Sequence, residues 1–170
     1  WNANMSVGSV DAPNKFVEYS DYFCPYCSEV KKATSESDYK KDYIDSGKVR
    51  HETRIVTVLK EMVPNTEQGA EAAFCAADQN KFDEYSQHIV KRIKSDYFDK
   101  GIGTKTVANP VSIPLLPLSY FTESATGVGM NSEEFEGCME SHKHKAKIEQ
   151  DTQKAMAAGV TGLPYLVVND

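Results

Sequence analysis

The stretch Lys15-Phe16-Val17-Glu18-Tyr19-Ser20-Asp21-Tyr22-Phe23-Cys24-Pro25-Tyr26-Cys27 decides the fold of this chain. Its first half is rich in aromatic and β-branched residues and follows the turn formers of residues 11–14, a pattern that predicts a strand over residues 15–20. Proline is tolerated in the first turn of a helix, where its missing N–H would be unpaired in any case. The sequence therefore predicts a helix with Cys24 as its N-cap and Pro25 as its first residue.

Residues further along extend this strand and helix into an α/β unit. The helical region is interrupted by the polar residues 34–38 and ends at Ser46-Gly47, and the Val-, Ile- and Thr-rich residues 48–59 predict a second strand. A strand–helix–strand unit of this kind has parallel strands and a right-handed crossover.

The rest of the chain is predicted to be mainly helical. Periodicity and capping residues predict helices over residues 66–77, 81–94, 118–128 and 131–158, the last with a break near Ser141. Tyr165-Leu166-Val167-Val168 predicts a buried strand that the chain enters through Pro164.

Composition excludes several classes of protein. The chain has 170 residues, of which 40% are hydrophobic and 26% charged, as expected for one compact domain. The net charge is -6 and the basic residues are scattered among acids, which argues against nucleic acid as a partner. The longest apolar runs, such as residues 72–77, are too short to cross a bilayer. The first residues carry neither the basic flank nor the apolar segment of a signal peptide, so the compartment has to be inferred from the chemistry.

Two cysteines at the predicted helix start indicate thiol–disulfide chemistry. Cys24 and Cys27 are three residues apart, a spacing that allows a disulfide, and unpaired N–H groups at the helix start favour a thiolate at Cys24. In such a setting a thiol pKa of about 8.5 can fall to between about 3.5 and 7.5. We expect Cys24 to be the nucleophile and Cys27 to resolve the mixed disulfide. The alternatives are half of a zinc site, which needs a second Cys or His pair of matching spacing, and a purely structural disulfide.

These residues resemble the DsbA-like thiol:disulfide oxidoreductases of the thioredoxin superfamily. Residues 11–13 and 17–27 look like the first strand and active-site helix of that family, residues 72–82 and 135–141 are similar to its inserted helices, and residues 159–164 are similar to its cis-proline loop. The resemblance implies a thioredoxin fold with an inserted helical subdomain. Residues 1–63 would form the first part of the thioredoxin fold with the active site, residues 64–139 the insertion, and residues 140–170 the second part.

The resemblance also implies features at the two ends of the sheet. The hairpin turn of the thioredoxin fold would begin at Asn169-Asp170, so we expect the last hairpin strand and the closing helix to be lacking. Residues 5–10 are a candidate outer strand.

The same resemblance implies the roles of residues around the motif. Pro164 would be the cis-proline facing Cys24, and the backbone of Leu163 would pair with an extended substrate. Pro25-Tyr26 replaces the Pro-His pair of the most oxidising relatives and equals the pair of glutaredoxins, so we expect a less oxidising disulfide. Glu18 corresponds to an acid that lies beneath the active site and relays a proton to the buried cysteine. The alternative is an exposed acid on a strand face.

Asp21, Cys75 and Cys138 each allow two interpretations. Asp21 either serves the same proton relay or ends the strand. Some relatives join the positions of Cys75 and Cys138 by a disulfide, which implies one here; two unrelated buried thiols are the alternative.

No metal and no cofactor are expected. Cys138 and His142 share a helix face but His144 does not, so a solvated polar face is favoured over a metal cluster.

The predicted function is a thiol:disulfide oxidoreductase outside the bacterial cytoplasm, most simply in the periplasm. It would introduce disulfides into reduced or unfolded exported proteins through a Cys24 mixed disulfide, and a membrane redox partner would reoxidise it. Pro25-Tyr26 leaves open a reducing or glutathione-linked thioltransferase or an isomerase. A non-catalytic binding or chaperone module of the same fold is the alternative outside the enzymes.

Overall fold

A four-stranded mixed sheet forms one half of the molecule. The computed structural model describes residues 1–104 and 111–169. The sheet has the order β1-β3-β2-β4, formed by β1 (Ser6–Val7), β3 (Val49–Ile55), β2 (Asn14–Ser20) and β4 (Tyr165–Val168). The two central strands are parallel, as the strand–helix–strand pattern predicts, and each outer strand is antiparallel to its neighbour.

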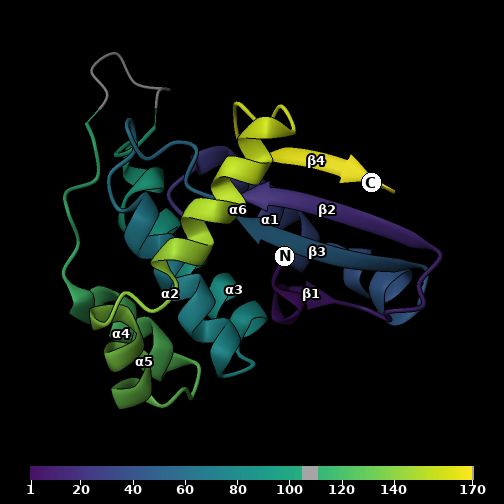
Figure 1. Cartoon of the computed structure of the whole chain (residues 1–170), viewed down its shortest axis with the longest axis horizontal. Helices are drawn as coiled ribbons and strands as arrows, with labels where there is room; N and C mark the ends of the chain where they lie inside the picture. Colours follow the sequence, from purple (N-terminus) through teal and green to yellow (C-terminus); the bar gives the residue numbers. More distant parts are fainter. Residues whose placement is uncertain (105–110, 170) are drawn as a thin grey trace.

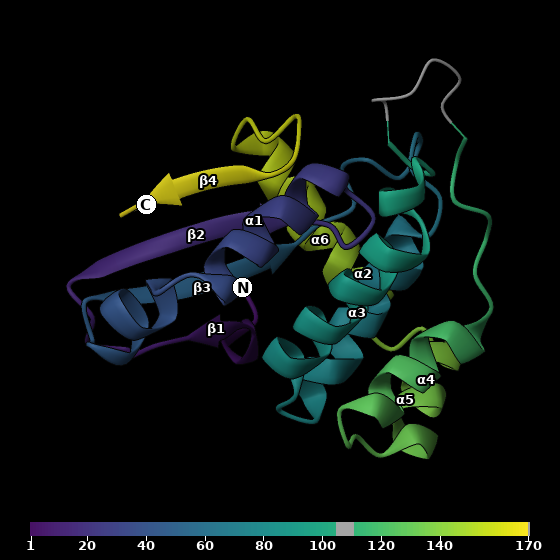
Figure 2. The same cartoon turned by 180° about the vertical axis from the view of Figure 1, so that it is seen from behind.

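Two helices cover opposite faces of this sheet. Helix α1 (Pro25–Glu36) lies on one face and α6 (Lys145–Ala157) on the other, as the two opposite views show (Figure 1, Figure 2). Because side chains alternate along a strand, β2 sends Val17 and Tyr19 into a small core with Ala155 of α6. Glu18, between them, points to the face of α1.

The inserted helices form a second layer beside the sheet. They are α2 (Thr66–Asp78), α3 (Phe82–Asp96), α4 (Leu118–Gly127) and α5 (Ser132–Glu140), gathered at one side of the molecule (Figure 1). Their core contains Phe74, Tyr85, Phe121 and Phe135, and Phe23 from the active-site segment is buried in the same cluster. The motif is therefore anchored to the helical part as well as to the sheet.

Shorter helices complete the described chain: η1 (Ala3–Met5), the π-helix η2 (Lys40–Asp45) and η3 (Phe98–Lys100). None of the described helices is both long enough and apolar enough to cross a membrane.

Most helix ends predicted from local sequence signals lie within one or two residues of the ends in the structure. Asn131 caps α5 through a hydrogen bond from the backbone N–H of Glu134, and the predicted break near Ser141 separates α5 from α6. The second strand ends earlier than predicted, at Ile55, because a turn closed by Lys60 and Thr57 follows it. Within residues 5–10, only Ser6–Val7 pairs with the sheet.

The prediction of a buried last strand was wrong for the described part of the chain. In β4, Tyr165 is 40%, Leu166 46% and Val168 64% exposed. The strand lies at the edge of the described sheet, and only Val167 packs into the core with α6. An apolar run alone does not distinguish a central strand from an edge strand.

Candidate active site

The two cysteines lie where β2 passes into α1. Cys24 is the extended N-cap residue and Pro25 occupies the first turn, as the sequence predicted. The backbone N–H of Cys24 donates to the carbonyl oxygen of Asp21 at 3.1 Å, which closes the turn between strand and helix. Both thiols are free, and each cysteine is only 2% exposed.

The two sulfurs have opposite acid–base character. A hydrogen bond from the Cys27 thiol lowers the pKa of Cys24; burial opposes this, and the backbone N–H groups of Cys27 and Tyr26 add to the lowering. Donating that hydrogen bond, together with burial, raises the pKa of the Cys27 thiol far above its ordinary value. The Cys24 thiol therefore loses its proton more readily than the Cys27 thiol does.

The loop between α6 and β4 lies opposite Cys24. The Leu163–Pro164 peptide bond is cis, and the carbonyl oxygen of Leu163 lies 3.5 Å from Cys24 Sγ. The structure therefore brings together residues 139 positions apart in the sequence.

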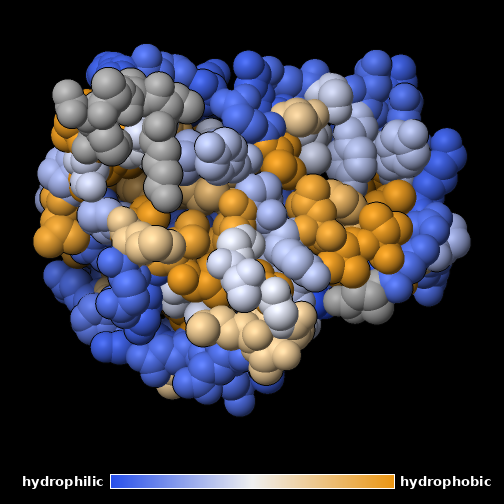
Figure 3. Space-filling view, turned by 90° about the horizontal axis from the view of Figure 1, so that it is seen from above, coloured by the Kyte–Doolittle hydropathy of each residue, from blue (hydrophilic) through white to orange (hydrophobic). Residues whose placement is uncertain are grey.

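A groove of about 480 Å³ opens beside Cys24. Its walls come from the start of α1, from the β3–α2 connection, from residues 103–104 and 111–113, and from the α6–β4 loop. Its larger apolar side chains are Phe23, Pro25, Leu59, Met62, Val63, Val111, Ile113 and Leu163. Tyr26 lies at this groove and is 59% exposed. The end of the molecule that carries the α6–β4 loop shows apolar surface in its middle and hydrophilic surface along much of its rim (Figure 3).

Glu18 lies beneath the motif and is 2% exposed, which excludes the alternative of an exposed acid on a strand face. A small cavity of about 10 Å³, the space of one water molecule, is lined by Glu18, Asp21 and Cys27. Glu18 and the buried Cys27 therefore border the same small cavity.

His51 is the partner of Glu18, and sequence reasoning missed it. Its Nε2 lies 3.2 Å from Glu18 Oε2, and His51 is itself 6% exposed. The signal that could have found it is the parallel pairing of the two predicted strands. With Phe16 opposite His51, the side chains of Glu18 and His51 share one face of the sheet two positions apart.

Asp21 closes the active-site turn and also carries a buried carboxyl group. Its Oδ1 accepts a hydrogen bond from the Phe23 N–H at 2.8 Å, and its Oδ2 accepts one from the Thr66 hydroxyl at 2.7 Å. Burial raises the pKa of Asp21 to about 6, although these hydrogen bonds act to lower it.

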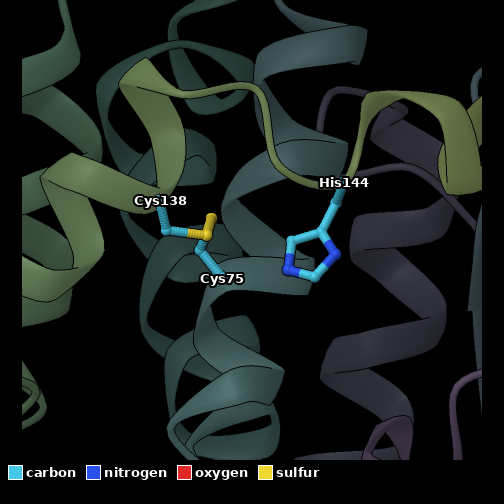
Figure 4. Close-up of side chains that lie close together, drawn as sticks. All are labelled: Cys75, Cys138 and His144. Atoms are coloured by element: carbon cyan, nitrogen blue, oxygen red, sulfur yellow. A yellow bond between two sulfur atoms is a disulfide. The ribbon is translucent and has the colours of Figure 1, made fainter.

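A disulfide between Cys75 and Cys138 ties α2 to α5, far along the chain from the motif. His144 lies beside the two sulfur atoms with its ring turned toward them (Figure 4). His144 Nε2 donates a hydrogen bond to Asp78 Oδ2 at 2.8 Å. His142 Nδ1 instead lies 2.9 Å from the carboxylate of Glu71. The structure thus does not bring Cys138, His142 and His144 together as one cluster, and both sulfurs beside His144 are bonded to each other.

Comparisons with known proteins agree with this geometry. A family model described as thioredoxin matches residues 2–170. A probable disulfide bond formation protein D of Bacillus anthracis is 27% identical over 99% of this chain and 71% of its own length. The oxidised crystal structure of BdbD from Bacillus subtilis superposes with a TM-score of 0.75 at 18% identity, covering 98% of this chain and 81% of that one.

A second solved structure, α-DsbA1 from Wolbachia pipientis, gives a TM-score of 0.73 at 20% identity, covering 98% of this chain and 75% of that one. The matched length includes the sheet, the inserted helices and the loop before β4. The chain therefore belongs to the thioredoxin family, among its DsbA-like protein-disulfide oxidoreductases.

Proposed function

We propose that this chain oxidises the cysteines of reduced, unfolded proteins outside the cytoplasm. The observation that carries the proposal is the placement of Cys24. It is a thiol of lowered pKa at a helix start, 3.5 Å from the carbonyl oxygen of the residue before a cis-proline, at the edge of an apolar groove.

The reaction proceeds through a mixed disulfide. In the oxidised enzyme, a substrate thiolate attacks Cys24 Sγ, the Cys24–Cys27 bond breaks, and Cys27 leaves with the electron pair. A second substrate thiolate then attacks the substrate sulfur of the mixed disulfide, which releases Cys24 as a thiolate and leaves a disulfide in the substrate. The high pKa of Cys27 means that it takes up one proton as it leaves.

Glu18 supplies that proton in the proposed mechanism. It lines the small cavity under Cys27, so one water molecule can carry the proton between the carboxyl group and the thiol. When a redox partner reoxidises the enzyme, the same path takes the proton away, so that Cys27 can attack.

The groove favours unfolded protein chains as substrates. Its apolar walls would bury side chains that a folded protein keeps inside, and the backbone at Leu163 can pair with an extended segment. Pro25 and Tyr26 form part of the same wall.

The Cys75–Cys138 disulfide supports a location outside the cytoplasm, because reducing cytosol rarely permits a structural disulfide. Reoxidation by a membrane redox partner belongs to the same proposal, since an oxidase has to pass its electrons on after each turnover.

Oxidative refolding of a reduced, unfolded protein tests the function. The oxidised enzyme should accelerate refolding, Cys24→Ser should abolish the acceleration, and Cys27→Ser should accumulate a mixed disulfide with the substrate. Rapid reduction of insulin or of glutathione mixed disulfides without refolding activity would instead identify a reducing thioltransferase. Full activity of Cys24→Ser would identify a binding module.

A further inference from the structure

The buried Glu18–His51 pair separates two cavities. The inner one, of about 10 Å³, is lined by Glu18 and Cys27 and lacks His51 in its wall. The outer one, of about 100 Å³, is lined by His51 and lacks Glu18. The hydrogen-bonded contact of 3.2 Å between Glu18 Oε2 and His51 Nε2 therefore crosses the partition between them.

The outer cavity reaches the surface of the protein. Its wall includes Ser35, Lys40 and Gln87, all of which are exposed. Lys31, Thr53 and Phe82 line both cavities and form the partition around the carboxylate–imidazole contact. A proton at Glu18 thus has a short route to solvent through one imidazole ring.

We propose that His51 is a positioning residue that completes a proton path from Cys27 through one water molecule, Glu18 and His51 to the outer cavity. This inference rests on the proposed role of Glu18 and adds the exit of the path. Glu18 by itself can hold one proton but is sealed from solvent, since it is 2% exposed. An imidazole can accept a proton at one nitrogen and release one at the other, which lets the path reset after each turnover.

The path accounts for the proton of Cys27 both when the Cys24–Cys27 bond opens and when it forms again. When a substrate thiolate opens the Cys24–Cys27 bond, Cys27 receives a proton from Glu18, and Glu18 is reprotonated from His51 and the outer cavity. When the reduced enzyme reacts with a disulfide, Cys24 forms the mixed disulfide. Cys27 then loses its proton to Glu18, attacks Cys24 Sγ, and releases the leaving thiolate.

The charged side chains that line the outer cavity with His51 are paired with other residues. Lys31 and Asp83, which line the same outer cavity, form an ion pair at 2.9 Å, and Lys40 is paired with Asp45 at 2.7 Å. The remaining neighbours in the ring contacts of His51 are Phe16 and Tyr39. Among these described neighbours, Glu18 is therefore the ionisable group in direct hydrogen-bond contact with the imidazole.

A two-step reaction with Ellman's reagent isolates the step that needs the path. Attack by Cys24 on this aromatic disulfide releases a first coloured thiolate, and attack by Cys27 releases a second. Single-turnover stopped flow at several pH values follows both steps in the wild type, in His51→Gln and in Glu18→Gln. The glutamine of His51→Gln keeps an amide near the Nε2 position but cannot titrate. His88→Gln, the same change at an exposed histidine, is the matched control.

We expect the first step to be unchanged in all variants. The second step should slow at least about tenfold near neutral pH in His51→Gln and in Glu18→Gln, and His51→Gln should lose one inflection of the pH profile of this step. The double variant should be no slower than Glu18→Gln alone, because both residues act in one path. Added imidazole should restore the second step in His51→Ala, in which the outer cavity is enlarged.

If the second step runs at the wild-type rate in His51→Gln but is slow in Glu18→Gln, the exit through His51 is overturned and the role of Glu18 stands. Wild-type behaviour of both variants would remove the whole path without touching the oxidase function, which the refolding assay measures separately. A slow first step in His51→Gln would show a purely structural role of His51 and overturn the inference. The same conclusion would follow if the second step of His51→Ala is slow and added imidazole fails to restore it.

Discussion

Tyr26, between the two cysteines, offers the Cys24 thiol no positively charged side chain. Its phenol side chain is 59% exposed and has no cationic form, so the lowering of the Cys24 pKa depends on the Cys27 thiol and on the backbone N–H groups of Cys27 and Tyr26. A cation at this position would stabilise the thiolate further.

Tyr26→His is expected to lower the Cys24 pKa further, because a nearby imidazolium favours the charged thiolate over the neutral thiol. A more stable reduced form makes the disulfide a stronger oxidant, so the reduction potential should rise. Thiolate absorbance against pH and equilibration with glutathione measure the two quantities. Tyr26→Phe should leave both unchanged, and a fall of the potential in Tyr26→His would contradict the argument.

Asp21 should make folding stability depend on pH. Its pKa in the folded protein is about 6 against an ordinary 3.8, so the folded state holds this proton more tightly than the unfolded state does. The resulting stabilisation is fully present below about pH 3.8 and is lost as pH rises through about 6.

Asp21→Asn should remove this contribution. Between pH 4 and 7, the free energy of unfolding of the wild type should fall relative to the variant by on the order of 2–3 kcal/mol. Urea unfolding of both proteins at several pH values checks this, since the difference between them cancels the other titrating groups. A difference that stays constant with pH would show that Asp21 ionises normally.

At the scale of elements, the Cys75–Cys138 disulfide holds α5 against α2. The two cysteines are 63 residues apart, a loop for which the chain-entropy argument gives about 4 kcal/mol before any strain is subtracted. Both helices contribute to the same core as Phe23, so this cross-link supports the wall behind the active site.

Cys75→Ala/Cys138→Ala is expected to lower the free energy of unfolding by about 2–4 kcal/mol, because the unfolded chain regains its freedom. Urea denaturation measures the change. Cys24→Ala/Cys27→Ala, which leaves the cross-link in place, serves as the control and should change stability far less. A loss below about 1 kcal/mol in the first variant would mean that helix packing alone holds α5.

At the scale of the whole molecule, the groove exists because segments far apart in the sequence meet at Cys24. The sheet part supplies the start of α1, the β3–α2 connection supplies Met62, and the α6–β4 loop supplies Leu163. Met62 is 68% exposed, so a change there alters the groove without disturbing the core.

Met62→Glu is expected to raise the KM for a reduced, apolar unfolded substrate about fivefold, the effect of roughly 1 kcal/mol of lost apolar contact. Reaction with a small dithiol should be unchanged, because the chemistry at Cys24 is untouched. Met156→Glu, the same change at an exposed methionine on α6, should bind substrate normally. Equal KM values in the two variants would place the substrate outside the groove.

Much of the fold followed from short-range signals. The helix start at Cys24-Pro25, the cap at Asn131 and the strand at residues 165–168 each depend on the preferences of a few adjacent residues. The resemblance to DsbA-like proteins added Pro164 and the Cys75–Cys138 pair, which spacing alone could not supply, since four cysteines allow three pairings.

The sequence by itself thus determined the helix start at Cys24, the order of the central strands and helices, and the class of chemistry, because these depend on local backbone geometry and on thiol spacing. Only the tertiary structure decided that Glu18 contacts His51, that Leu163 reaches Cys24 across 139 residues, and that β4 is exposed at the edge of the described sheet. Alternation along a strand tells which side chains share a face, but which partner lies opposite them is set by strand register and by the packing of distant segments.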